Sequence, residues 1–289
     1  RGMRVVNSAA ELAAAITSAK REAKAAFGDD RMLIEKYVQN PRHIEVQIIG
    51  DSHGNLLSLW ERECTLQRRH QKVIEEAPSP TLNAAQRETV CEAARKAAGA
   101  VNYVGAGTIE FVSDGKDVFF IEMNTRVQVE HPVTELVTGI DLVREQLMIA
   151  SGHKLSIKQE DVVLTGHAIE CRINAEDPDT FMPSPGTIRH FHAPGGPGVR
   201  VDTHVYEGYA VPPNYDSMIG KLIVHGADRE QAICRMRVAL SEMVVDGIKT
   251  NIPLQQRIMR DQGFHAGGQN IHYLEKRLAE RKNKTLAIG

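Results

Sequence analysis

The segment from Glu122 to Pro132 concentrates residues that could do chemistry. Within nine residues it carries two carboxylates, an amide and a guanidinium, directly after an apolar run: Glu122, Glu130, Asn124 and Arg126 follow Val118-Phe119-Phe120-Ile121. Carboxylates drawn toward a core need a cation or many hydrogen-bond donors, and one amide with one guanidinium is too little. The segment therefore predicts a site for a metal ion or an anionic substrate.

A further carboxylate, Glu110, is predicted to lie near Glu122 across a β-hairpin. Two β-prone runs flank Ser113–Asp117, which is a good hairpin turn signal. With a loop of Asp114–Lys116, Glu110 pairs with Phe120, and the two carboxylates become diagonal neighbours on one face, roughly 7 Å apart. A two-residue loop would instead put them on opposite faces of the hairpin.

The hairpin composition favours a hard cation. Glu110 and Glu122, with Asn124 as a third oxygen donor, could clamp one or two Mg²⁺ or Mn²⁺ ions that carry phosphates, whereas zinc prefers nitrogen and sulfur. The alternative is a surface hairpin with two solvated carboxylates, because charged strand residues usually face water. The residues alone leave both interpretations open.

Three blocks of sequence together make the chain recognisable. They are the Glu122–Pro132 segment, the upstream run Glu61–Lys72 and the downstream run Glu170–Glu176. Over essentially its whole length the chain resembles biotin carboxylase, the ATP-grasp component of acetyl-CoA carboxylase and related biotin-dependent carboxylases. The resemblance implies an α+β fold, in which an ATP-grasp catalytic core is followed by an antiparallel, β-rich C-terminal domain.

The resemblance also assigns roles in a bicarbonate pocket. It implies that Glu130 is the general base that removes the bicarbonate proton, so that bicarbonate can attack the γ-phosphate of ATP. Arg126, Gln128 and the Val129 main chain would bind the anion. Lys72 would hold bicarbonate and the transferred phosphoryl group, a task that suits a compact point charge.

Arg172, in the strand-like segment Glu170–Asn174, has two possible roles. The resemblance implies that it stabilises the developing enolate of biotin, as an oxyanion-hole donor would. The residues alone allow a simpler role, a salt bridge to Glu170 or Glu176.

The nucleotide contacts also follow from the resemblance. Gln67, His70 and His43 match nucleotide-binding positions, and main-chain groups at Glu35 and Val38, in Glu35-Lys36-Tyr37-Val38, match the adenine-binding hinge on a predicted strand Met32–Val38. Without the resemblance, the basic run that ends at Lys72 is a solvated mixed-charge face, and His43 is a satisfied strand histidine.

The order of elements predicts three regions. Residues 1–38 would be a remnant of the ATP-grasp lid, 39–157 the catalytic core, and 158–289 the C-terminal domain, because β-branched residues and tight turn signals dominate from Val162 onward. In the related family the run Arg1–Val6 directly follows a glycine-rich phosphate loop. The resemblance therefore implies a C-terminal part of a longer enzyme, inactive by itself.

Bulk properties narrow the class of protein. A formal net charge of -2 argues against nucleic acid as the main partner. The chain has no apolar run of the roughly 18 residues needed to span a bilayer, and no signal-peptide core, which predicts no membrane partner and a cytoplasmic location. The four cysteines lack the spacing of a zinc site or a disulfide framework.

The resemblance implies the remaining cofactors and partners. The cofactors would be ATP with two Mg²⁺ or Mn²⁺ ions, the substrates bicarbonate and carrier-bound biotin. Because the chain has no Met-Lys-Met attachment site, the biotin carboxyl carrier protein would be separate, as would the carboxyltransferase subunits of an acetyl-CoA carboxylase for fatty acid biosynthesis. The enzyme would be a homodimer.

Three alternatives stay open from the sequence. The chain could belong to another acyl-CoA or pyruvate carboxylase. It could be a carbamoyl-phosphate-synthetase-like domain, which should lack the Arg172 segment. It could also be a non-catalytic module for dimerisation or carrier docking.

Overall fold

The structure, a computed structural model, describes residues 2–286 and divides into two compact units, 1–39 and 40–289. The first unit contains helix α1 (Ala9–Phe27), which ends at Gly28 in the left-handed region, φ 73°, with the Gly28 N–H donating to the Lys24 carbonyl. The prediction of a strand at Met32–Val38 is wrong. These residues form no strand, and all but Val38 are exposed, because among the described residues no neighbouring strand pairs with them.

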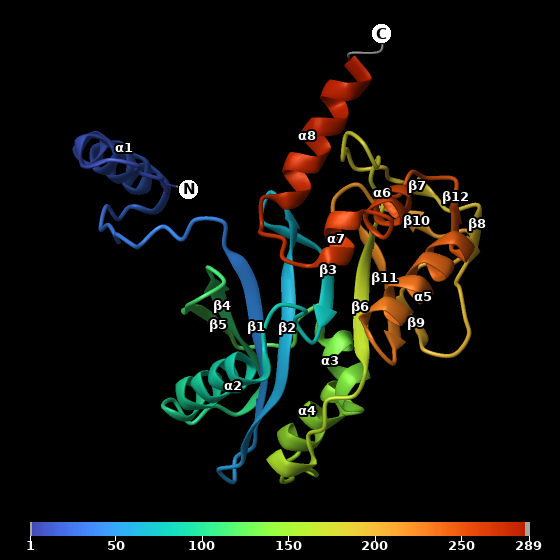
Figure 1. The fold of residues 1–289 in the computed structure, drawn as a ribbon, viewed down its shortest axis with the longest axis horizontal. Coiled ribbons are helices and arrows are strands. Elements are labelled where there is room, and N and C mark those ends of the chain that lie inside the picture. The colour runs from blue at the N-terminus through green and yellow to red at the C-terminus, as the bar shows by residue number, and fades with distance from the viewer. Residues whose placement is uncertain (1, 287–289) are drawn as a thin grey trace. The chain divides into compact units, whose positions relative to one another are not determined.

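One eight-stranded antiparallel sheet organises the second unit (Figure 1). Its spatial order is β5-β4-β1-β2-β3-β6-β11-β9, so strands from both of the predicted regions 39–157 and 158–289 share one sheet. The strands are β1 (Arg42–Gly50), β2 (Leu56–Arg68), β3 (Gln71–Ala77), β4 (Gly105–Ser113), β5 (Val118–Asn124), β6 (His167–Asn174), β9 (Val199–Thr203) and β11 (Met218–Gly226).

The two faces of this sheet differ because side chains alternate along each strand. Ile44, Val46 and Ile48 of β1 pack with helix α2 (Ala84–Gly99), and the matching face of β6 and β11 packs with α5 (Arg229–Glu242). The opposite face carries α3 (His131–Thr138) and α4 (Leu142–Ala150). Glu45 and Gln47 of β1 lie on this second face and are fully buried.

Smaller elements complete the second unit (Figure 1). They are the 3-10 turn Gln159–Asp161, the short strands β7 (Gly186–Thr187), β8 (His190–His192), β10 (Ala210–Val211) and β12 (Val244–Asp246), and the helices α6 (Ile252–Ile258), α7 (Gln262–Ala266) and α8 (Tyr273–Leu286). Strand β7 pairs with β10, and β8 pairs with β12.

The β4–β5 hairpin corrects the predicted register. Its loop is Asp114–Asp117, closed by the Asp114 N–H donating to the Asp117 carbonyl at 3.2 Å, and Phe120 pairs with Phe111 instead of Glu110. This loop alone would place Glu110 and Glu122 on opposite faces. A bulge between Glu110 and Phe111 shifts the register, so that Glu110 lies directly opposite Glu122. The shared face was predicted correctly, for the wrong reason.

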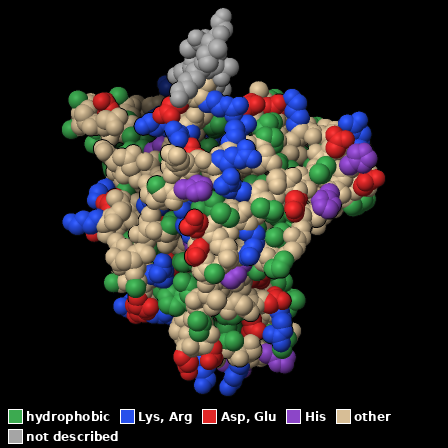
Figure 2. Space-filling view, turned by 45° about the vertical axis from the view of Figure 1, so that its right-hand side comes forward, with side chains coloured by type: hydrophobic (Ala, Val, Ile, Leu, Met, Phe, Trp, Pro, Cys, Tyr) green, Lys and Arg blue, Asp and Glu red, His purple; other side chains and the backbone are tan. Residues whose placement is uncertain are grey.

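Among the described residues, no helix is both long enough and apolar enough to cross a membrane. Basic and acidic side chains are interspersed over the surface seen in Figure 2, without a large field of either sign.

Asp51, in the turn between β1 and β2, has a carboxylate that the fold stabilises in its charged form. Its carboxylate accepts hydrogen bonds from the backbone of His53, Asn55 and Leu155 and from the Asn55 amide, at 2.7–3.0 Å. Burial opposes the charge, but these donors lower the pKa of Asp51 from its ordinary 3.8 to about 2. Asp51→Asn should therefore cost about 2 kcal/mol of unfolding free energy at neutral pH.

The pH dependence of that loss checks its cause. A carboxyl whose folded pKa is depressed contributes its full stability only above its unfolded pKa, and loses it as the pH falls toward the folded pKa. Urea unfolding should thus show that the difference in unfolding free energy between the wild type and Asp51→Asn is about half as large at pH 3 as at pH 7. A difference that stays constant from pH 7 to pH 3 would assign the loss to packing instead of charge.

Candidate functional site

Lys72, near the start of β3, is surrounded by carboxylates. Its ammonium nitrogen lies 2.6 Å from Glu130 Oε1 and 3.3 Å from Glu110 Oε1, and it also contacts Glu45 Oε1. Burial by itself would lower the pKa of Lys72, but these carboxylates raise it above its ordinary value. Lys72 is therefore a fixed cation at the centre of the cluster.

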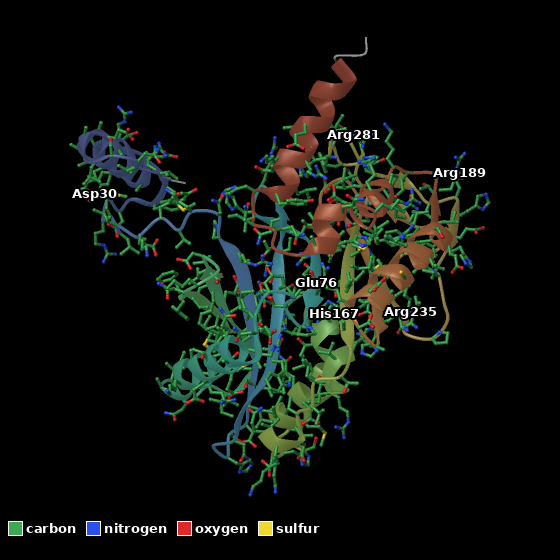
Figure 3. The ribbon with its side chains drawn as sticks, viewed as in Figure 1. Asp30, Glu76, His167, Arg189, Arg235 and Arg281 are labelled. Atoms are coloured by element: carbon green, nitrogen blue, oxygen red, sulfur yellow. The ribbon has the colours of Figure 1, made fainter. Side chains whose placement is uncertain are left out.

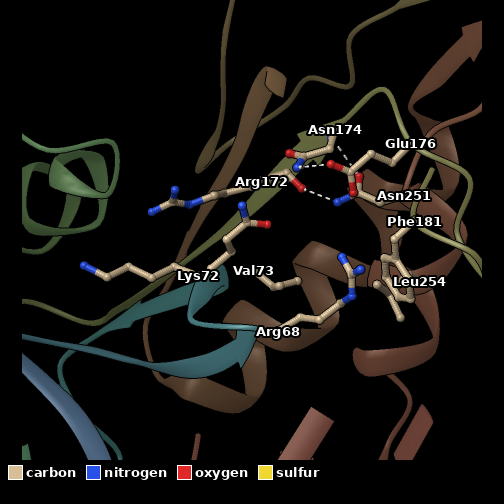
Figure 4. Close-up of a pocket in the computed structure, with 10 residues that line it drawn as sticks. Arg68, Lys72, Val73, Arg172, Asn174, Glu176, Phe181, Asn251 and Leu254 are labelled. Carbon is tan, nitrogen blue, oxygen red and sulfur yellow. Dashed lines mark hydrogen bonds between the residues drawn. The ribbon is translucent and has the colours of Figure 1, made fainter. Parts of the chain in front are cut away.

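Glu130 bridges two cations from different strands. It lies just before α3, with only 2% of its surface exposed, and its second oxygen accepts from Arg172 Nη2 at 3.1 Å. Arg172, on β6, also donates from Nε to Glu75 Oε1 at 2.6 Å. Figure 4 shows the Lys72 and Arg172 side chains extending in the same direction from β3 and β6. The Glu130 carboxylate thus has a cation on each oxygen.

A buried arginine, Arg62, forms hydrogen bonds with several residues around this cluster. Arg62 of β2 is fully buried and donates to Glu45, Gln47, Thr108, Thr134 and Gln128 at 2.7–3.4 Å. Burial opposes the Arg62 charge, but Glu45 raises its pKa. Because these five partners come from four segments, Arg62 fixes β1, β4, α3 and the Gln128 loop around the site.

His43 of β1 lies at the edge of the same cluster. Its Nε2 is 3.0 Å from Glu45 Oε1 and 3.1 Å from Glu110 Oε2, and its Nδ1 is 3.1 Å from the Gln67 amide. Burial would lower the pKa of His43, but the two carboxylates raise it to about 9. His43 and Gln67, both predicted nucleotide contacts, therefore lie side by side at the edge of the cluster.

The predicted metal ligands lie together beside this cluster. The Asn124 amide donates to Glu110 at 2.9 Å and to Glu122 at 3.3 Å, and Gln128 donates to Glu110 at 2.8 Å. Glu122 is exposed, so its carboxylate can accept a solvated cation. The three predicted ligands offer oxygen donors, which suit Mg²⁺ or Mn²⁺. The residues present therefore fit such a cation.

Two other groups of the described residues also bring metal-binding atoms within 4.8 Å of one another. They are His43, Glu45 and Glu110, and Glu45, Cys64 and Glu130. The Lys72 ammonium already contacts a carboxylate oxygen of Glu45, Glu110 and Glu130. These groups are thus better described as the anionic shell of Lys72 than as metal sites.

A pocket of about 370 Å³ opens over these residues. Of the predicted site residues it is lined by Lys72, His70, Glu110, Glu122, Asn124, Arg126, Gln128, Val129, Glu130 and Arg172. Arg126 is exposed and donates to the Val127 carbonyl at 3.3 Å, so its guanidinium is only lightly held. A smaller pocket adjoins Lys72 and Arg172, and Arg68 stacks 3.6 Å above the Phe181 ring there (Figure 4).

Three predicted residues belong to the first unit. Glu35, Lys36 and Val38 lie in the first unit, in a segment without regular structure. Their assignment to an adenine-binding hinge stays a prediction.

Several residues at the site were not predicted from the sequence. They are Glu45, Arg62, Glu75, Glu170 and Lys221, the last of which donates to the Val129 carbonyl at 2.8 Å. The alternation of His43, Glu45 and Gln47 in β1 was the available signal, because every second residue is polar. That signal predicts a polar face, but not that Glu45 and Gln47 are fully buried.

Comparisons with known proteins agree with this architecture. Residues 1–158 match the family model "Carbamoyl-phosphate synthase L chain, ATP binding domain", and residues 170–276 match "Biotin carboxylase C-terminal domain". The chain is 59% identical over 283 residues to a biotin carboxylase of Pseudomonas aeruginosa, covering 98% of this chain and 63% of that protein. It is 52% identical over 276 residues to a pyruvate carboxylase subunit of Methanothermobacter thermautotrophicus, covering 95% and 56%.

Solved structures are similar as well. The biotin carboxylase-beta-gamma-ATP complex from Campylobacter jejuni matches with a TM-score of 0.90 and 50% identity, over 96% of this chain and 62% of that one. The biotin carboxylase domain dimer of Hydrogenobacter thermophilus 2-oxoglutarate carboxylase, with MgADP, ADP and bicarbonate, matches with a TM-score of 0.89 and 48% identity, over 96% and 61%. The chain spans about three fifths of the length of these relatives.

Proposed function

The chain belongs to the biotin carboxylase family, and from that premise we propose that the protein carboxylates biotin with ATP and bicarbonate, through carboxyphosphate. One observation carries the proposal: the Glu130 carboxylate, at a pocket wall, is held between Lys72 and Arg172. A carboxylate that could act as the base and two cations that could bind anions therefore lie within one hydrogen bond of each other. Substrates with two negative centres, bicarbonate and a phosphoryl group, suit such a pair of cations.

In the first step Glu130 takes the proton of bicarbonate. A bicarbonate oxygen then attacks the γ-phosphorus of ATP, the bond from that phosphorus to the ADP oxygen breaks, and ADP leaves. Lys72 faces the transferring phosphoryl group, while Arg126, Gln128 and the Val129 main chain orient bicarbonate. Glu110, Glu122 and Asn124 would hold Mg²⁺ or Mn²⁺, which neutralises phosphate charge when bound. Positioning and neutralisation of charge supply most of the catalysis in such reactions.

In the second step carboxyphosphate breaks its carbon–oxygen bond to give CO₂ and phosphate. The phosphate takes the proton from biotin N1′, and that nitrogen attacks CO₂. Arg172, which points into the pocket from β6, stabilises the enolate oxygen of biotin as this charge develops. Its own contacts with Glu75 and Glu130 keep its guanidinium in place.

The alternatives are weaker on specific grounds. A carbamoyl-phosphate-synthetase-like domain would share residues 1–158, but the match of residues 170–276 to a biotin carboxylase C-terminal domain includes Arg172. A non-catalytic docking module would have no use for this buried polar cluster, because buried ion pairs are often no more stabilising than well-packed apolar residues.

The proposal includes the partners, the oligomeric state and the location of the protein. The partners are a biotin carboxyl carrier protein and carboxyltransferase subunits, and the protein forms a homodimer in the cytoplasm as part of an acetyl-CoA carboxylase. The relatives named only "Biotin carboxylase" favour this assembly, whereas relatives named for pyruvate or 2-oxoglutarate carboxylase leave another acyl substrate as the alternative.

Carboxylation of free biotin by the native protein tests the proposal. Radiolabelled bicarbonate should enter an acid-labile product only when both ATP and biotin are present. Label that enters an acid-labile product without biotin, or enters none while ATP is cleaved, would reject the biotin half of the proposal.

The metal assignment gives a second testable prediction. Glu110→Gln and Glu122→Gln keep the shape of the hairpin but remove a charge that holds a hard cation. Each variant should raise the Mg²⁺ concentration needed for half-maximal activity by about tenfold or more, and Mn²⁺ should restore activity in part. A titration of activity against each metal provides the measurement. An unchanged metal requirement in both variants would make the two carboxylates plain surface charges.

A further inference from the structure

Glu170 has a buried carboxyl group that the proposed reaction does not use. It lies on β6 two residues before Arg172, so both side chains point to the face of the sheet that carries the site. Its exposed fraction is 0%, and neither of its oxygens has a hydrogen-bond partner among the described residues. A buried polar group without a partner costs stability, and a buried charge costs far more.

The residue directly opposite Glu170 is a second buried carboxyl group. Glu75 of β3 pairs with Glu170 in the register of the two strands, and directly paired side chains have Cβ atoms about 4.5–5.5 Å apart. Glu75 is also 0% exposed, its Oε1 accepts from Arg172 Nε at 2.6 Å, and its Oε2 has no partner within the part of the chain that the structure describes. Two carboxylates only accept hydrogen bonds, so they can bond to each other only after one of them takes up a proton.

The surrounding charges decide which of the two holds the proton. Arg172 contacts Glu75 and Glu130, while Lys221 of β11 contacts Asp202 at 3.5 Å and the Val129 carbonyl, so neither cation contacts Glu170. Burial, together with the charge of Glu75, raises the pKa of Glu170 well above its ordinary value. Burial raises the pKa of Glu75 as well, but the hydrogen-bonded Arg172 opposes that rise and favours the carboxylate there, which leaves the proton on Glu170.

We propose that Glu170 is a positioning residue: held as the neutral acid, it donates its proton to Glu75 Oε2 and so keeps Glu75 Oε1 directed at Arg172. Glu170 itself touches no substrate. Through Glu75 it fixes the direction of the Arg172 guanidinium, which reaches from β6 to Glu130 at the pocket. The kinetic part of this inference rests on the proposed function, whereas the proton and the Arg172 contact do not.

Two variants of the native protein distinguish the loss of the hydrogen-bond donor at position 170 from a change in side-chain volume. Glu170→Gln keeps a neutral donor toward Glu75, whereas Glu170→Met keeps most of the volume and removes the donor. The infrared difference between wild type and Glu170→Gln should contain the carbonyl stretch of a protonated carboxylic acid, and it should persist at about pH 8. Absence of this band would overturn the inference, whether or not the protein carboxylates biotin.

The second readout follows Arg172 directly. The nuclear magnetic resonance signal of its Nε–H group, identified by its loss in Arg172→Gln, should keep its position in Glu170→Gln and shift in Glu170→Met. In the same variants, biotin carboxylation should stay near the wild-type rate in Glu170→Gln and fall about tenfold in Glu170→Met, the loss expected for one buried hydrogen bond. An Arg172 signal that does not move in Glu170→Met would overturn the positioning role.

A matched control excludes a general effect on the fold. Glu76, the next residue of β3, is also buried, but it lies on the other face of the sheet and binds His167 at 2.8 Å and Arg229 at 2.6 Å (Figure 3). Glu76→Gln should lower thermal stability without moving the Arg172 signal or the infrared band. If Glu76→Gln shifts the Arg172 signal as much as Glu170→Met does, the effect belongs to the sheet and the inference fails.

Discussion

Glu130→Ala should abolish bicarbonate-dependent ATP cleavage in the native protein. Glu130 is the carboxylate that contacts both Lys72 and Arg172, and it lies in the pocket wall. Without it bicarbonate keeps its proton and is a poor nucleophile, and groups that transfer protons are typically worth 10²–10⁴ in rate. The measurement is the release of ADP with and without bicarbonate at saturating Mg·ATP.

A surface variant serves as the control for this experiment. Glu88→Ala removes an exposed carboxylate that forms an ion pair with Arg95 at 3.1 Å. Glu88 lies on α2, which covers the opposite face of the sheet from the site. Its bicarbonate-dependent rate should match the wild type. Retention of more than a tenth of the wild-type rate in Glu130→Ala would mean that another group takes the proton.

Arg172→Gln should separate the two half-steps. The loss of a donor to a developing oxyanion costs roughly 3–4 kcal/mol, so biotin carboxylation should fall by 10²–10³. Bicarbonate-dependent ATP cleavage should fall much less, by about tenfold, because Glu130 loses its contact with Arg172 Nη2 but keeps Lys72 at 2.6 Å. Both rates are measured on the same preparation, with and without free biotin.

The ratio of those two rates is what decides the role of Arg172. If both fall by the same factor, Arg172 acts by holding Glu130 or carboxyphosphate, and its assignment to the biotin enolate is wrong. The comparison also separates Arg172 from Glu130, since Glu130→Ala should remove both activities together.

The sequence predicted the strands of the hairpin better than their pairing. Turn chemistry in Ser113–Asp117 located the turn, because aspartate and glycine favour such loops. The bulge beside Glu110 could not be read from the sequence, since a bulge depends on how the whole sheet twists and pairs. The prediction of a strand at Met32–Val38 failed for a related reason. Its residues favour strands, but a strand also needs a neighbouring strand that pairs with its backbone hydrogen-bonding groups.

The residues of the site were predicted unevenly for a physical reason. Glu130 stood out from the composition of its own segment, whereas Lys72 and Arg172 stood out only through the resemblance, because the three residues are far apart along the chain and only the fold brings them together. Glu75 belonged to a run interpreted as a solvated mixed-charge face, and Glu170 was considered only as a salt-bridge partner of Arg172, since a polar face has the same sequence pattern whether water or a helix covers it. Their burial is visible only in the folded sheet.

Transfer of oxygen from bicarbonate to phosphate tests the central claim most directly. If bicarbonate attacks the γ-phosphorus of ATP in this pocket, one of its oxygens stays on that phosphorus when carboxyphosphate breaks down. With heavy-oxygen bicarbonate, mass spectrometry of the released phosphate should therefore show one heavy oxygen in each phosphate formed, and Glu130→Ala should form almost none. Bicarbonate-stimulated phosphate release without any heavy oxygen in the product would mean that water attacks ATP, and it would contradict the account.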